Sequence, residues 1–150
     1  LAALTDVFTI GGTKNGALFG EAVIMTVPCD HFRWHIKQRG GMLAKGRLLG
    51  VQFDALMENG VYEKVGAYEN EMADRLREGI RAAGYPFYCE TTTNQLFPVL
   101  PNAVIDRLEK DFGFYRQNRV DEGHQAIRLV TSWNTQKEEA DALIRALKEC

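Results

Sequence analysis

Apolar residues recur along this chain with two different periods, one typical of helices and one of strands. Residues 61–84 carry apolar side chains at spacings of three and four, which predicts a long amphipathic helix ending at Gly84. A second amphipathic helix is predicted over 136–149, opened by a capping box from Thr135 to Glu138. The residues expected to face inward are Val61, Val65, Tyr68, Met72, Leu76 and Ile80 in the first helix and Ala140, Leu143, Ile144 and Leu147 in the second.

Two segments near the start, 6–10 and 20–27, are rich in β-branched residues and predict an antiparallel pair of strands. The glycines of the intervening Gly-Gly-Thr-Lys-Asn-Gly allow the chain to reverse, which places Lys14 at the tip of the hairpin. Both strands are too apolar for a hairpin with one solvent-exposed face, so we expect both faces to be covered in the intact protein. If these faces are not covered, we expect the strands to pair with another copy of the chain or to be poorly ordered.

The rest of the chain predicts short elements that together form a small α+β layer with a mostly antiparallel sheet. A helix capped by Asp30 is expected first, followed by one with Leu49, Phe53 and Leu56 on one face that ends at Asn59-Gly60. A later helix should turn Val104, Ile105 and Leu108 inward. The expected ranges are helices 30–38, 42–58 and 101–112 and strands 87–91, 95–100, 114–119 and 125–131.

Composition limits the kind of protein this can be. The net charge of −2 over 150 residues argues against a general nucleic-acid or membrane-surface binder. Cys29, Cys89 and Cys150 are odd in number and lack CxxC spacing, so we expect free thiols in the cytoplasm. No apolar run is long enough to span a bilayer. Since the first residue is Leu rather than Met, we expect a piece of a longer protein.

Lys14 is the first candidate for chemistry. Gly11 and Gly16 have P-loop spacing, but Ala17-Leu18 stands where Lys-Ser/Thr is required, and no Rossmann pattern is present. What is left is a lysine in a glycine-rich turn, where few side chains shield it, as a Schiff-base lysine requires, or else a solvated turn lysine.

A basic segment is the second candidate, because no acid occurs from His31 through Phe53. Its cations either form a solvated helix face or help to hold a phosphate or carboxylate. Nucleic-acid stacking on Phe32 and Trp34 is a further alternative, and Cys29, His31 and His35 have spacing that could bind a metal. Because no fourth ligand is evident, we assign no metal site. The five cations of the segment are Arg33, Lys37, Arg39, Lys45 and Arg47.

The segment from Thr5 to Ile24, with Gly-Gly-Thr-Lys-Asn-Gly at its centre, closely resembles the cofactor-lysine segment of the threonine aldolase/β-eliminating lyase family. These enzymes depend on pyridoxal 5'-phosphate (PLP) and have PLP-transferase fold type I. The agreement extends over nearly the whole chain. It continues in Lys37-Gln-Arg-Gly-Gly-Met-Leu-Ala-Lys-Gly-Arg47, Gln52-Phe-Asp-Ala-Leu56, Thr93-Asn-Gln-Leu-Phe97 and Ile127-Arg-Leu-Val-Thr-Ser-Trp133.

The resemblance implies a role for individual residues. Lys14 would form the Schiff base with PLP, and Thr13 with Gly12 and Gly11 would shape the loop around it. Lys45 or Arg47 would lie near the cofactor phosphate. Arg128 would bind the α-carboxylate of the substrate, the alternative being a strand-surface arginine.

The resemblance also implies domains and an activity. Residues 1–58 would end the large PLP-binding domain, and residues 59–150 would form the small C-terminal α+β domain. The activity implied is retro-aldol cleavage of threonine or a similar β-hydroxy-α-amino acid to glycine and an aldehyde, in a homodimer or homotetramer. Family members are more than twice this length, and the portion not present here carries most of the cofactor site. We therefore expect these 150 residues alone to be inactive.

Two alternatives to this reaction stay open from the sequence. The same fold and lysine serve several reactions, so a PLP-dependent β-eliminating lyase is one. A non-catalytic α+β module that binds an acidic partner through the basic segment is the other.

Overall fold

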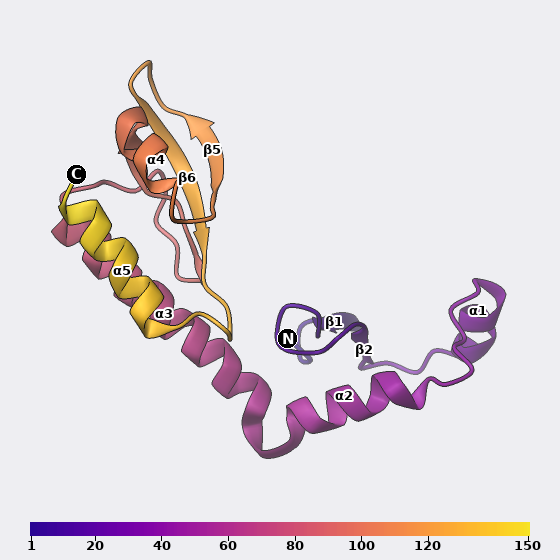
Figure 1. The fold of residues 1–150 in the computed structure, drawn as a ribbon. Helices are drawn as coiled ribbons and strands as arrows, with labels where there is room; N and C mark the ends of the chain where they lie inside the picture. Colours follow the sequence, from indigo (N-terminus) through magenta and orange to yellow (C-terminus); the bar gives the residue numbers. More distant parts are fainter. The chain divides into compact units, whose positions relative to one another are not determined.

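The computed structural model describes all 150 residues, and their contacts divide the chain into two compact units. The first unit is Leu1–Lys64 and the second is Val65–Cys150. The division falls within the first turn of α3 (Val61–Ala82), drawn in magenta in Figure 1. Each unit is described by itself below.

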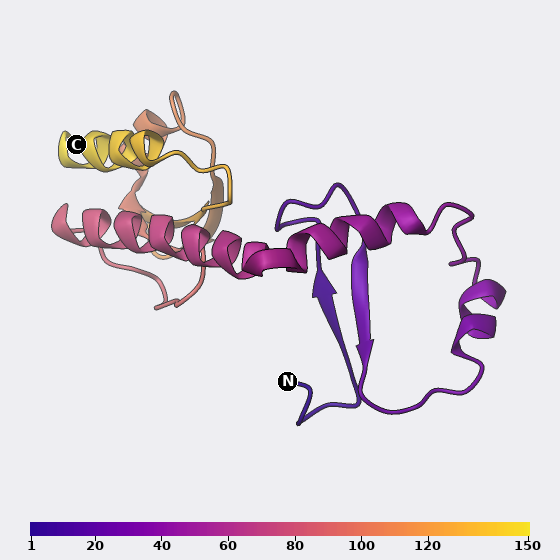
Figure 2. The same ribbon diagram turned by 90° about the horizontal axis from the view of Figure 1, so that it is seen from below.

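The first unit contains a two-stranded antiparallel hairpin with a helix running across it (Figure 2). Strand β1 (Val7–Gly11) pairs with β2 (Glu21–Met25) in a register that places Val7 opposite Met25 and Gly11 opposite Glu21. The predicted hairpin is thus confirmed. Gly12 is the only buried residue of this unit, and Val7 and Val23 expose apolar side chains on the same hairpin face.

The helices of the first unit begin later than the sequence predicts. Helix α1 (Phe32–Gln38) has His31 at its N-cap with a φ of 61°, and no side chain caps it, so the predicted cap by Asp30 is wrong. Helix α2 spans Arg47–Met57. It starts later than predicted because a turn, in which Gly46 N–H donates to Leu43 O, precedes it. A short 3₁₀ turn, η1 (Glu58–Gly60), follows, and Asn59 and Gly60 take the positive φ angles expected of them.

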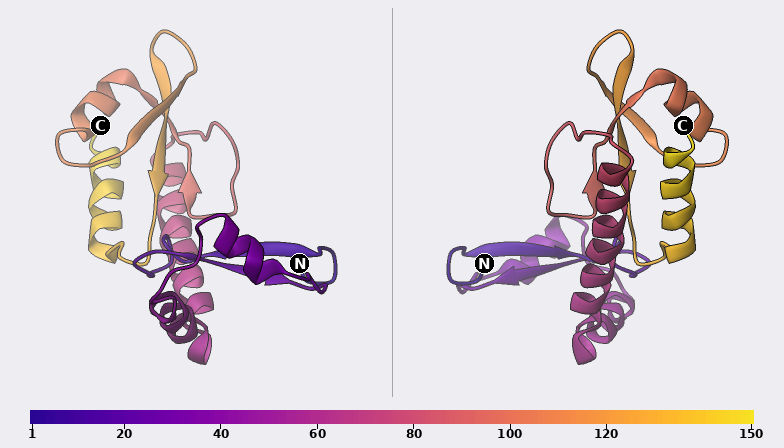
Figure 3. Two further views of the ribbon diagram at one scale, coloured as in Figure 1. Left: turned by 90° about the vertical axis from the view of Figure 1, so that its right-hand side faces the viewer. Right: turned by 90° about the vertical axis from the view of Figure 1, so that its left-hand side faces the viewer.

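The second unit is a small α+β layer, as predicted. Strand β6 lies at the centre of an antiparallel sheet of order β3-β6-β4, and β5 pairs with β6 in a twisted hairpin (Figure 3). Its elements after α3 are β3 (Gln95–Leu96), β4 (Val99–Pro101), α4 (Asn102–Leu108), β5 (Tyr115–Arg119), β6 (His124–Val130) and α5 (Lys137–Lys148).

One hydrophobic core joins the helices and strands of the second unit, and α3 and α5 pack side by side (Figures 1 and 2). The predicted inward faces are buried at Met72, Leu76 and Ile80 in α3, whereas Val61 is exposed. The other core residues are Ala73, Leu96, Leu100, Val104, Ile105, Leu108, Ile127, Leu129, Ala140, Leu143 and Leu147. Tight packing is clearest at Gly79, where an added Cβ would overlap the side chain of Ile144.

Three sequence predictions for the second unit are wrong in detail. The strand expected over 87–91 does not form, because Phe87 makes only an isolated bridge to Pro98. Since proline lacks the N–H that a ladder needs, the strand expected over 95–100 is split into β3 and β4 on either side of Pro98. The capping box of α5 uses Gln136 and Glu139 rather than Thr135 and Glu138.

No helix of the structure combines the length and the apolar character needed to cross a membrane.

Candidate active site

Lys14 lies in a turn that is closed by backbone hydrogen bonds on both of its sides. The carbonyl oxygen of Gly12 accepts from the N–H groups of Asn15 and Ala17, at 3.0 Å each. The N–H of Gly12 donates to the carbonyl of Gly20 at 3.2 Å, where the hairpin re-forms. The backbone around Lys14 is therefore specified, while its side chain is exposed.

Helix α2 supports this turn from one face. An added Cβ at Gly12 would lie 2.9 Å from Phe53 Cζ and 2.9 Å from Ala17 Cβ, so only glycine fits between the turn and the helix. The side-chain oxygen of Gln52 accepts from Leu18 N–H at 2.7 Å. In addition, Gln52 Nε2 donates to Leu48 O at 2.9 Å, which orients the amide. The predicted face of α2 with Leu49, Phe53 and Leu56 is the one that contacts the turn.

Tyr62, a residue that no sequence motif singles out, also contacts the hairpin. The hydroxyl of Tyr62 donates to Gly11 O at 3.2 Å, at the last residue of β1. Helix α2, Tyr62 and the turn's own hydrogen bonds thus hold the peptide on both sides of Gly12.

The cations of the basic segment have no acidic partners, unlike some of the arginines of the second unit. None of Arg33, Lys37, Arg39, Lys45 and Arg47 takes part in an ion pair of the structure. By contrast, Arg75 donates to both carboxylate oxygens of Asp141 at 2.6 and 2.8 Å. The segment therefore presents donors that an external anion can use.

Of the two candidates for the cofactor phosphate, Lys45 lies in the turn before α2 and Arg47 is the first residue of that helix. Both side chains are exposed. Since residues two apart on a helix do not share a face, Arg47 leaves α2 on a different side from Leu49, which contacts the lysine turn. The structure therefore does not bring Arg47 to the face of α2 that holds Lys14.

Arg128 lies on β6 in the second unit, with a feature that surface arginines rarely have. Its Nε is buried and has no hydrogen-bond partner. Its guanidinium carbon is 4.9 Å from the ring centroid of Tyr115, the residue directly opposite on β5. A hollow of about 390 Å³ adjoins this pair, lined by Gly113, Phe114, Tyr115, Arg128 and Val130.

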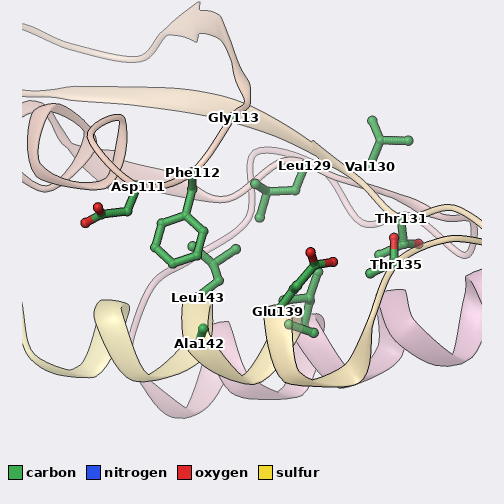
Figure 4. Close-up of a pocket in the computed structure, with 12 residues that line it drawn as sticks. Asp111, Phe112, Gly113, Leu129, Val130, Thr131, Thr135, Glu139, Ala142 and Leu143 are labelled. Carbon is green, nitrogen blue, oxygen red and sulfur yellow. The ribbon is translucent and has the colours of Figure 1, made fainter.

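Another hollow in the second unit, also of about 390 Å³, contains none of the predicted site residues. Figure 4 shows the ring of Phe112 and the side chain of Leu143 along it, with the carboxylates of Asp111 and Glu139 among its lining groups. Because its charged groups are acidic, it does not suit a phosphate or carboxylate ligand.

No three His, Cys, Asp or Glu side chains of the structure gather where they could hold a metal ion.

The chain is similar in sequence and structure to threonine aldolases. A solved structure of the Leishmania major threonine aldolase superposes with a TM-score of 0.92 and 41% identity, covering 99% of this chain and 44% of that one. Low specificity L-threonine aldolases of Pseudomonas sp. (strain NCIMB 10558) and Pseudomonas aeruginosa are 28% and 26% identical, over 88% and 95% of this chain. No family model matches the chain.

The fold extends to enzymes with little sequence similarity. A Sphingomonas wittichii serine palmitoyltransferase superposes with a TM-score of 0.68 at 15% identity, covering 98% of this chain and 40% of that enzyme. The expected fold class, the C-terminal part of PLP-transferase fold type I, is confirmed. The chain spans 38% and 41% of the length of the two Pseudomonas relatives.

Proposed function

From its relationship in sequence and fold to the threonine aldolases, we propose that this chain is part of a PLP-dependent aldehyde-lyase. The reaction is retro-aldol cleavage of threonine or a similar β-hydroxy-α-amino acid to glycine and an aldehyde. The observation that carries the proposal is the 41% identity to the Leishmania major threonine aldolase across 99% of this chain. A fold alone serves several reactions, so this identity, rather than the likeness to a palmitoyltransferase, favours the aldolase activity.

The residues present fit the cofactor at the position of Lys14. A Schiff-base lysine needs an amine that the cofactor's aldehyde can approach, held on a backbone that does not move away. The exposed Lys14 side chain on the closed turn meets both conditions, and Gly12 admits the close packing of that turn on α2. We assign Lys14 to the covalent attachment, and Thr13 and Gly12 to the shape of the loop. When bound, PLP supplies an electron sink for the carbanion left at Cα after Cα–Cβ cleavage.

The basic segment is proposed to bind the phosphate. Phosphate is recognised by charge-assisted donors that are not already neutralised, and the five cations of this segment have no ion-pair partners. Lys45 and Arg47 are the residues assigned to this role.

Arg128 is assigned to the α-carboxylate of the amino-acid substrate. An unpaired donor in a buried position costs free energy, about 1–3 kcal/mol for a neutral group and more for a charged one, unless a ligand satisfies it. The buried Nε of Arg128 has no partner in the protein, so a carboxylate in the adjoining hollow would remove that cost. A guanidinium also matches the two oxygens of a carboxylate.

The remaining parts of the proposal concern the whole protein. We assign residues 1–58 to the end of the large PLP-binding domain and residues 59–150 to the small C-terminal domain. We propose a homodimer or homotetramer, supported by the exposed apolar side chains of the first unit, among them Leu18, Trp34 and Val51. A cytoplasmic location is supported by three free cysteines, all exposed.

The experiment that tests the function uses protein expressed from its natural reading frame. With threonine and added PLP, formation of glycine and acetaldehyde is measured for the wild type, Lys14→Ala and the control Lys110→Ala, an exposed lysine outside the proposed site. We expect the Lys14 variant to fall to background and the Lys110 variant to keep most of its activity. Wild-type protein that eliminates the β-substituent instead, without forming glycine, would favour the β-eliminating lyase. A Lys14 variant as active as wild type would contradict the assignment of the lysine.

A further inference from the structure

The position of Arg128 depends on a partner across the sheet. Tyr115 on β5 and Arg128 on β6 are directly opposite in the antiparallel register. Side chains of such a pair leave the same face of the sheet with Cβ atoms about 4.5–5.5 Å apart. Because neighbouring Ile127 and Leu129 are buried in the core, the Tyr115–Arg128 pair lies on the opposite face of β6.

Contact between the two side chains is made by the ring face and not by the hydroxyl. The guanidinium carbon lies 4.9 Å from the Tyr115 centroid, within the range of a cation–π interaction. The tyrosine is otherwise 67% exposed, so it is not needed to fill the core. An exposed aromatic over a partly buried cation indicates a role for the ring in holding the cation.

The way in which other arginines of this unit are held makes Arg128 distinctive. Arg75 is oriented by Asp141, and Arg116 by Glu109 at 2.7 Å and by Asp106. A carboxylate partner fixes a guanidinium but occupies the same N–H groups that a ligand carboxylate would use. Stacking on a ring fixes the plane of the guanidinium and leaves its edge free.

We propose that Tyr115 is the positioning residue for Arg128, and that its ring orients the guanidinium for the substrate carboxylate without occupying its donors. This inference rests on the proposed role of Arg128. The adjoining hollow fits it, because the lining residues other than Arg128 carry no charge that would compete for the guanidinium. The ligand recognised is the α-carboxylate of an amino acid.

The kinetic test compares Tyr115→Leu, Tyr115→Phe and a control, Tyr88→Leu, in protein expressed from its natural reading frame. Leucine keeps apolar bulk and removes the ring, whereas phenylalanine keeps the ring face. A cation–π contact changes affinity by about two- to thirty-fold, so we expect Tyr115→Leu to raise KM for the amino acid by that factor, with kcat little changed. Tyr115→Phe should restore the wild-type KM. Tyr88 is 52% exposed and its hydroxyl accepts from Asn118 Nδ2 rather than contacting this pair, so its replacement should not change KM.

A second readout does not depend on turnover. The Nε–H resonance of Arg128 is followed by NMR while acetate is added, in the wild type and in both Tyr115 variants. We expect a saturable shift in the wild type and in Tyr115→Phe, and a weaker affinity in Tyr115→Leu by the same factor as the KM change. Thermal unfolding of each variant establishes that it is folded.

The outcomes distinguish the positioning role of Tyr115 from the proposed role of Arg128 in binding the carboxylate. If Arg128→Lys raises KM but Tyr115→Leu does not, Arg128 binds the carboxylate and the role of Tyr115 is refuted. If Tyr115→Phe weakens binding as much as Tyr115→Leu, the hydroxyl rather than the ring face matters, and the inference is also refuted. If Arg128→Lys has no effect on KM or on acetate binding, the proposed carboxylate site itself is wrong.

Discussion

Replacing Gly12 with alanine tests whether packing against α2 holds the lysine turn. The new methyl group would lie 2.9 Å from Phe53 Cζ, 2.9 Å from Ala17 Cβ and 3.3 Å from the Gly20 carbonyl oxygen. Phe53 is a rigid ring, and Ala17 Cβ is fixed to the backbone, so neither contact can be relieved by rotating the end of a flexible chain. The turn must therefore move away from α2 or distort.

The expected magnitude follows from the cost of overpacking. Inserting a methyl group into a well-packed site costs about 1–3 kcal/mol. If the cost falls on the turn, the equilibrium between its closed and open forms shifts by about five- to 150-fold. Neighbouring Gly11 is the matched control, because an added Cβ there meets nothing within 4 Å. Gly11→Ala should instead be neutral or stabilise the protein by about 0.4–1 kcal/mol through a less flexible unfolded chain.

Amide hydrogen exchange at Asn15 and Ala17 measures the effect directly, because both N–H groups donate to Gly12 O. We expect their protection to fall in Gly12→Ala by the factor above, and to be unchanged in Gly11→Ala. Equal protection in the wild type and Gly12→Ala would refute the claim that the close approach of turn and helix holds Lys14 in place. Equal loss in both variants would show that the effect comes from strand conformation instead of packing.

Two further predictions concern the second unit. Burial raises the pKa of Glu69, although a hydrogen bond from Trp133 N–H opposes the shift, so its ionisation costs stability as the pH rises through the folded-state pKa. Glu69→Gln should therefore have a higher melting temperature than the wild type at neutral pH, and the difference should vanish below the ordinary pKa of glutamate. A difference that persists in acid would contradict this. Gly79→Ala should destabilise by about 1–2 kcal/mol, because contact with Ile144 costs more than helix propensity gains. Gly66→Ala on the same helix, where the added methyl meets nothing, should stabilise by up to about 1 kcal/mol in denaturant titrations, and the same sign for both changes would refute the packing argument.

The spacing of apolar residues predicted the long helices and the core of the second unit, because helix geometry puts residues three and four apart on one face and that face is buried. Residues at spacings of three and four on α3 face α5 and the sheet, and Leu76 and Ile80 are buried as expected. Val61, at the start of the same pattern, is exposed. The period identifies a face, but it does not say how far along the helix a partner extends.

The ends of strands and the caps of helices depend on which of several possible backbone hydrogen bonds forms, and the sequence pattern does not show this. Thr135 was the expected cap of α5, but its hydroxyl accepts from Ser132 N–H at 2.8 Å. The cap is therefore Gln136, whose N–H donates to Glu139 Oε2 at 3.1 Å. Pro98 similarly ends a strand that its apolar neighbours would have continued.

The candidate site could be predicted as residues but not as contacts. Lys14 followed from the motif around it, whereas its support by Gln52 and Phe53 required knowing which element the face of α2 meets. The Tyr115–Arg128 pair was missed because the β5–β6 register contains an irregularity between Arg116 and Arg119. A strand register shifted by even one residue places side chains on the other face, so this pairing required the structure.

The most direct test of the account is reductive trapping of the cofactor. Protein expressed from its natural reading frame is incubated with PLP, treated with borohydride, digested and analysed by mass spectrometry. The account predicts that the phosphopyridoxyl group is attached predominantly to Lys14, at a PLP concentration that leaves Lys37 and Lys45 largely unlabelled. Labelling spread over the exposed lysines, with no preference for Lys14, would contradict the account and favour a non-catalytic binding module.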